Sequence, residues 1–134
     1  MFLVDTNVWL ERLLDQARSE EVGRFLNVLP TDRLFITDFA LHSVAIVMST
    51  LNKMDAFVQF VQDAFVDGAL SVVRLEPEEM QRIGFLKDKF DLDFDDAFQY
   101  AAAEKYGLTL VSLDADFDRT ERGRKTPAQI LQAQ

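Results

Sequence analysis

The chain has 134 residues, of which 49% are hydrophobic, and it carries a net charge of −9. This length fits one domain, and the acidic balance argues against a surface that coats polyanions, because nonspecific nucleic-acid binding relies on Lys and Arg. The absence of cysteine excludes disulfides and thiolate metal sites. The first residues lack the basic start of a signal peptide, and no apolar run is long enough to span a bilayer. We therefore expect a single cytoplasmic domain over residues 1–134 with no membrane association.

Short apolar runs along the chain are typical of buried strands, and the amphipathic segments between them predict helices. The predicted strands cover 1–5, 33–37, 69–75 and 108–113. The predicted helices cover 6–29, with a candidate break near Gly23, and 38–51, 54–68, 76–90 and 95–107. Because strands alternate with helices, we expect an α/β fold: a three-layer α/β/α domain with a central parallel β-sheet.

Acidic residues stand where predicted strands end. Asp5 ends the first strand, Asp114 and Asp116 follow the fourth, and Asp96 opens the helix before it. Ligands of parallel sheets bind outside the carboxyl ends of the strands, so these carboxylates are expected to converge. Each acid alone is also typical of a helix cap or a turn. Together they form a hard oxygen donor set that suits Mg²⁺ or Mn²⁺.

The segments that carry these acids also resemble a known family. LVDTNVWLE (3–11), DDAFQYAAAEKYG (95–107) and LVSLDADF (110–117) are similar, in this order, to the motifs of the PIN-domain nucleases, including VapC-like toxins. The resemblance implies a parallel sheet flanked by helices and a divalent-metal endoribonuclease that hydrolyses RNA. It also implies a cognate antitoxin and often a homodimer.

The resemblance assigns roles to individual residues. Asp5, Asp96 and Asp114 match the family's acidic metal-ligand positions, and Asp116 matches its variable fourth acid. Asn7 and Ser112 match polar positions that orient these carboxylates. The implied principal ligands are Asp5 and Asp96, with Asp114 and Asp116 binding or orienting a second ion or the water.

One position departs from the family pattern. The family usually carries a Glu early in the helix after the second strand, and here Ser43 stands at that position. Asp38, one turn earlier, is a candidate replacement for the missing charge. His42, the only histidine, is a candidate metal or RNA contact, although a lone histidine on a helix is more often structural.

A local basic segment follows the last acids. Arg119, Arg122, Arg124 and Lys125 lie within 118–126, where they would hold RNA phosphates beside a metal site or form a solvated loop. Apolar residues that the core does not use, such as Phe39, Met48 or Met54, are candidates for a dimer or antitoxin patch.

Two alternatives to an active ribonuclease remain. Ser43 at the usual Glu position favours a catalytically weakened PIN domain that acts as an RNA- or protein-binding module. A phosphotransfer receiver domain would share the size and the acids. That class needs an Asp at the end of a central strand and a Lys at the end of a late one, and neither is found here.

Overall fold

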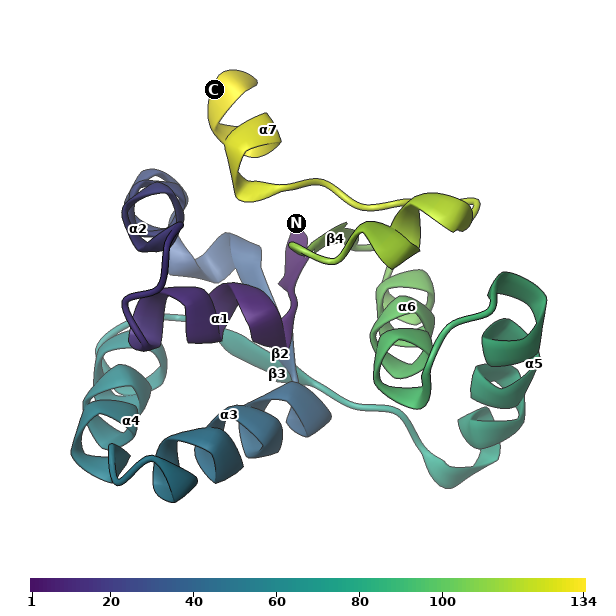
Figure 1. The fold of residues 1–134 in the computed structure, drawn as a ribbon, viewed down its shortest axis with the longest axis horizontal. Helices are drawn as coiled ribbons and strands as arrows, with labels where there is room; N and C mark the ends of the chain where they lie inside the picture. The colour runs from purple at the N-terminus through teal and green to yellow at the C-terminus, as the bar shows by residue number, and fades with distance from the viewer.

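Four parallel strands form the centre of the molecule. The computed structural model describes residues 1–134, and its sheet has the strand order β3-β2-β1-β4 (Figure 1). The strands are β1 (Phe2–Val4), β2 (Leu34–Thr37), β3 (Ser71–Val73) and β4 (Thr109–Val111). Leu3 of β1 pairs with Phe35 on one side and Leu110 on the other. The central parallel sheet is thus confirmed, with strands shorter than the predicted runs.

Seven α-helices surround this sheet. They are α1 (Thr6–Leu13), α2 (Ser19–Val28), α3 (Asp38–Thr50), α4 (Met54–Val61), α5 (Met80–Phe90), α6 (Phe94–Tyr106) and α7 (Pro127–Gln132). A π-helical turn over Gln62–Val66 extends α4. None of the helices is long and apolar enough to cross a membrane.

The predicted break near Gly23 is wrong. The chain turns instead between α1 and α2, where Asp15 adopts a φ of 51°. Gly23 lies inside α2, and a Cβ there would be 2.7 Å from the guanidinium carbon of Arg12. The missing side chain therefore gives Arg12 of α1 the room to cross α2 and donate to the Ser19 carbonyl at 3.2 Å.

Both faces of the sheet are covered, which confirms the three-layer α/β/α architecture. Leu3 and Leu110 point into a core shared with α5 and α6. The next residue of each strand, Val4 and Val111, points into a second core shared with α1, α2, α3 and α7. Figure 1 shows these two groups of helices on opposite sides of the strands. Burial on both faces explains why the strands read as continuous apolar runs.

The candidate interface residues have different environments. Met48 is fully buried in the second core, so its predicted place on an exposed patch is wrong. Met54 is 42% exposed and remains a candidate for a dimer or antitoxin contact. Phe39 is half-buried, and its ring packs against Phe98 with centroids 5.0 Å apart.

Substitution of two glycines by alanine distinguishes the effect of backbone strain on stability from the effect of helix propensity. Gly107 ends α6 with a φ of 64°, whereas Gly84 lies within α5, and neither has a heavy atom within 4 Å of an added Cβ. We predict that Gly107→Ala lowers the free energy of unfolding by about 1 kcal/mol, because alanine is strained at positive φ. Gly84→Ala should raise it by up to about 1 kcal/mol. Urea unfolding of the two variants checks both signs, and destabilisation of both would contradict this assignment.

Candidate metal centre

Pairing of β1 with β4 brings Asp5 beside the segment that carries Asp114. The amide of Asp5 donates to the Val111 carbonyl at 2.9 Å, which continues the β-ladder past the end of β1. Asp5 is also the N-cap residue of α1, because its Oδ1 accepts from the Thr6 amide at 2.8 Å. Asp114 opens a 3-10 turn and accepts from the Asp116 amide at 2.9 Å. Both acids therefore combine a local capping role with a place at the sheet edge.

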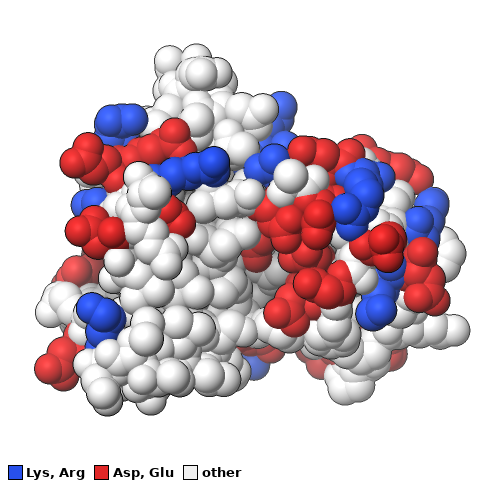
Figure 2. Space-filling model, viewed as in Figure 1, with Lys and Arg blue, Asp and Glu red and all other residues white.

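Helix α6 supplies the third segment of the site. The Asp93 side chain caps this helix by accepting from the Asp96 amide at 2.9 Å, which places Asp96 in the first turn. Asp96, Asp114 and Asp116 each present a carboxylate oxygen within 4.8 Å of the other two. Figure 2 shows acidic side chains gathered on this face, next to a largely uncharged surface.

Asp5 lies beside this group of three rather than inside it. Its side chain is 5% exposed and is held by hydrogen bonds from the Gln99 amide at 3.0 Å and the Ser112 hydroxyl at 2.8 Å. A cleft of about 190 Å³ is lined by both Asp5 and Asp96. The structure therefore brings three of the four predicted ligands together and places the fourth, Asp5, in the cleft that Asp96 also lines.

Asn7 and Ser112 lie where the resemblance places them. The Ser112 hydroxyl donates to Asp5 Oδ2 and accepts from the Asp114 amide at 3.0 Å and from Asn7 Nδ2 at 3.3 Å. The Asn7 side-chain oxygen accepts from the Leu113 amide at 3.2 Å. One serine hydroxyl thus fixes the separation between Asp5 and the segment of Asp114.

Burial and like charge raise the pKa values of two acids. Burial is the main cause for Asp5, and it outweighs the hydrogen bonds from Ser112 and Gln99, which lower its pKa. The pKa of Asp96 rises to about 8, first because of burial and then because of the neighbouring Asp114 carboxyl group. Asp96 is 8% exposed, and its Oδ2 is buried without a hydrogen-bond partner.

The donor set at this site fits a hard divalent cation. Oxygen atoms of Asp96, Asp114 and Asp116 converge, and the buried Asp96 Oδ2 has no partner within the protein. A buried carboxylate oxygen without a partner is costly, and carboxylates are the ligands that Mg²⁺ and Mn²⁺ prefer.

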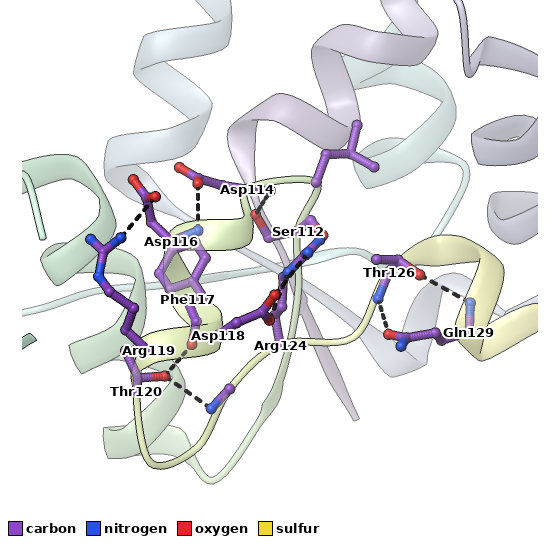
Figure 3. Close-up of polar contacts among 12 residues, drawn as sticks. Ser112, Asp114, Asp116, Phe117, Asp118, Arg119, Thr120, Arg124, Thr126 and Gln129 are labelled. Carbon is purple, nitrogen blue, oxygen red and sulfur yellow. Dashed lines mark hydrogen bonds and ion pairs between the residues drawn. The ribbon is translucent and has the colours of Figure 1, made fainter.

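Arg119 fixes the outermost acid of the group. Its guanidinium pairs with Asp116 Oδ1 at 3.0 Å (Figure 3). It also donates to the Phe90 carbonyl at 3.1 Å and to the Asp91 carbonyl. It therefore links Asp116 to the carboxyl end of α5. Cations are favourable at this end of a helix because its last carbonyls have no partners within the helix.

The other basic side chains of the segment also have contacts inside the fold. Arg122 donates to the carbonyls of Ala103 and Leu108, and Arg124 pairs with Asp118 (Figure 3) and donates to the Ser112 carbonyl. The Lys125 side chain is exposed, while its backbone pairs with the edge of β4. An RNA contact by Arg119, Arg122, Arg124 or Lys125 stays a prediction.

Ser43, which stands where the family usually has a Glu, lines the cleft, but its neighbours Asp38 and His42 do not. Ser43 lines the cleft of Asp5 and Asp96, as does the exposed Asp95. Asp38 begins α3 and accepts from the Phe39 amide at 2.8 Å, and His42 is exposed. Neither Asp38 nor His42 lines this cleft, so a metal role for either stays a prediction.

Sequence reasoning missed Gln99. This residue is 2% exposed, lies one helical turn after Asp96 and donates to Asp5. The sequence does contain a pattern that could have indicated this residue. Gln99 stands three positions after Asp96, in an Ala-rich helix whose other residues from 97 to 103 are all hydrophobic.

The raised pKa of Asp96 predicts that pH controls the stability of the metal-free protein. The native state keeps a proton on Asp96 that the unfolded chain releases, so the free energy of unfolding falls as pH rises from about 5 to 8. Asp96→Asn should remove most of this fall, while Asp88→Asn on the exposed face of α5 should not. Urea unfolding in EDTA measures the slope. An unchanged slope in Asp96→Asn would contradict the pKa assignment.

Comparisons with known proteins agree with this geometry. The sequence model of the PIN domain matches residues 2–123. No match is found among curated proteins.

Solved structures with a similar fold include a toxin–antitoxin complex and a toxin. A toxin–antitoxin complex from Klebsiella pneumoniae is 20% identical, with a TM-score of 0.74 over 95% of this chain and 98% of that one. VapC20 from Mycobacterium tuberculosis, a sarcin–ricin loop cleaving toxin, is 20% identical, with a TM-score of 0.72 over 88% of this chain and 93% of that one. VapBC2 from Rickettsia felis, bound to a promoter DNA fragment, is 14% identical, with a TM-score of 0.72 over 92% and 96%. These likenesses show the fold, and the family match over most of the sequence shows that the chain belongs to the PIN-domain family.

Proposed function

We propose that this chain is a divalent-metal-dependent endoribonuclease and the toxin of a type II toxin–antitoxin pair. The observation that carries the proposal is the unpartnered, buried Asp96 oxygen, which lies beside Asp114 and Asp116 at the carboxyl end of the sheet. PIN and VapC proteins are typically nucleases, and membership of that family supports a role for these carboxylates in phosphodiester cleavage. The proposed substrate is single-stranded or structured RNA in the cytoplasm.

The proposed ligands are Asp5, Asp96, Asp114 and Asp116. Oxygen atoms of the last three lie within 4.8 Å of one another, and Asp5 lines the same cleft as Asp96. A bound Mg²⁺ or Mn²⁺ would polarise a phosphodiester and acidify a water molecule. The protein's own contribution is to hold the carboxylates in place. Ser112 fixes Asp5 relative to Asp114, and Arg119 fixes Asp116.

The cleft beside the acids is the proposed approach of the RNA backbone. Ser43 adds no further carboxylate to this acidic wall at the position where the family usually places a Glu, which lowers the repulsion of a phosphate at that position. Lys125, whose side chain is exposed, and the outer faces of Arg119, Arg122 and Arg124 are the proposed sources of attraction for more distant phosphates.

The proposed protein partners are an antitoxin and a second copy of the chain. An apolar groove of about 410 Å³ runs between α1, α2 and α4, lined by Trp9, Leu13, Leu26 and Phe60 among others. A groove of this kind suits the apolar face of an antitoxin helix. Solved relatives of the fold include toxin–antitoxin complexes, which supports this assignment. Exposed Ile46, Met54 and Val58 on α3 and α4 are the proposed homodimer contact.

A second candidate function is a weakened PIN domain that binds RNA or protein without cleaving it. Ser43 in the cleft is the observation that favours it, because one fewer carboxylate lowers the charge available to a cation.

We predict that the purified protein cleaves labelled single-stranded RNA in Mn²⁺. EDTA should abolish cleavage, and Asp96→Asn should lower it by at least about 100-fold because it removes a charged ligand. Asp88→Asn, a surface carboxylate on α5, should cleave like the wild type. Gel analysis of a varied RNA set measures all four reactions.

The atypical position separates the two candidate functions. Cleavage by the wild type would show that Ser43 does not disable the centre. If only Ser43→Glu cleaves, the weakened-domain function is correct. If neither folded protein cleaves in Mn²⁺, the nuclease proposal is wrong.

A further inference from the structure

We propose that Gln99 is a positioning residue that fixes the carboxylate of Asp5, and that Thr37 in turn fixes the amide of Gln99. The proposal rests on the proposed function only where it treats Asp5 as part of the metal centre. Gln99 Nε2 donates to Asp5 Oδ1 at 3.0 Å, and Thr37 Oγ1 donates to Gln99 Oε1 at 2.7 Å. We name this chain of contacts, from Thr37 through Gln99 to Asp5, the amide relay.

All three members of the amide relay are buried. Asp5 is 5% exposed, Gln99 2% and Thr37 0%. Solvent therefore has little access to these bonds, and each lost bond would leave a polar group without a partner. A buried polar group without a partner is destabilising, whereas an apolar side chain in the same place would carry no such penalty. The retained amide is therefore better explained by what it does to Asp5 than by packing.

The contacts of Thr37 determine which end of the amide faces Asp5. The Thr37 hydroxyl oxygen accepts from the Ala40 amide at 2.9 Å, as the N-cap of α3. Its single proton is thus free to be donated to Gln99 Oε1. The opposite amide orientation would leave the Thr37 proton without Gln99 Oε1 as its acceptor and would place two acceptors together at the Asp5 carboxylate. The relay therefore presents the NH₂ group, and only that group, to the carboxylate.

The amide relay connects three elements that meet at the centre. Asp5 follows β1, Thr37 ends β2 and caps α3, and Gln99 belongs to α6. Because Gln99 is one turn after Asp96, the same helix that carries one proposed ligand also orients Asp5. Together with the Ser112 hydroxyl on Oδ2, Gln99 on Oδ1 leaves the Asp5 carboxylate little freedom to rotate.

Mn²⁺ affinity of the purified protein tests the proposal without RNA. We expect Gln99→Met, which keeps length but removes the donor, to weaken Mn²⁺ binding by about 10-fold, the usual effect of losing a partner of a metal ligand. Gln62→Met is the matched control, because the exposed Gln62 amide donates to the Asp67 carboxylate at 3.1 Å, far along the chain from this site. Free Mn²⁺ measured by electron paramagnetic resonance gives the affinities.

A double-mutant cycle separates a relay from two independent effects. Thr37→Val should weaken Mn²⁺ binding in the wild-type background and have no further effect on affinity in Gln99→Met. Its effect on stability should be smaller in Gln99→Met, where only the α3 cap is lost, than in the wild type, where Gln99 Oε1 also loses its donor. Thr37→Ser keeps the hydroxyl and should restore affinity. Additive losses of affinity would overturn the role of Thr37.

A metal-free measurement keeps this proposal distinct from the proposed function. Three-bond couplings across the Asp5 Cα–Cβ bond should report one rotamer in the wild type and averaging in Gln99→Met. Averaging in Gln99→Met supports the positioning role even if the wild-type protein binds no Mn²⁺. A wild-type protein that binds no Mn²⁺ would count against the proposed nuclease and not against the positioning role. A single unchanged rotamer in Gln99→Met, with unchanged Mn²⁺ affinity, would overturn the inference.

Discussion

Crowding of carboxylates at one end of a parallel sheet is the constraint on which the rest of this structure depends. β1 and β4 are neighbours, so the acids that follow them share one edge, and α6 adds Asp96 to the same place. Burial and like charge disfavour the ionised form of these carboxyl groups, and for this reason the pKa of Asp96 is raised. A fold that keeps such a cluster has to hold each carboxylate firmly and to offset the repulsion with protons or a cation.

Contacts with neighbouring residues hold three of the four acids in place. Asp5 is held by Thr6, Gln99 and Ser112, and Asp114 by the Asp116 amide. Asp116 is paired with Arg119, whose other donors anchor it to the end of α5. Asp96 alone keeps a buried oxygen without a partner. The apolar layers on both faces fix the register of the strands that carry these acids, because a one-residue slip of β1 would turn Leu3 and Val4 to the opposite cores.

The sequence predicted the architecture, the acids and the orienting residues Asn7 and Ser112, but not the other contacts that support the acids. Alternating strands and helices indicated the parallel sheet, and topology then implied that Asp5, Asp96 and Asp114 meet. Gln99, the pairing of Arg119 with Asp116 and the close crossing at Gly23 join residues far apart in the chain or depend on side-chain reach. No periodicity encodes such contacts. The break between α1 and α2 was misplaced because Gly23 marks a close approach between helices rather than a turn.

The most direct test of the metal centre is the anomalous diffraction of Mn²⁺ in crystals of this protein. The account predicts an anomalous peak among the proposed ligands Asp5, Asp96, Asp114 and Asp116, and the loss of that peak in Asp96→Asn crystals. An ordered acidic cluster without a peak at millimolar Mn²⁺, or a peak only at surface carboxylates elsewhere, would contradict it.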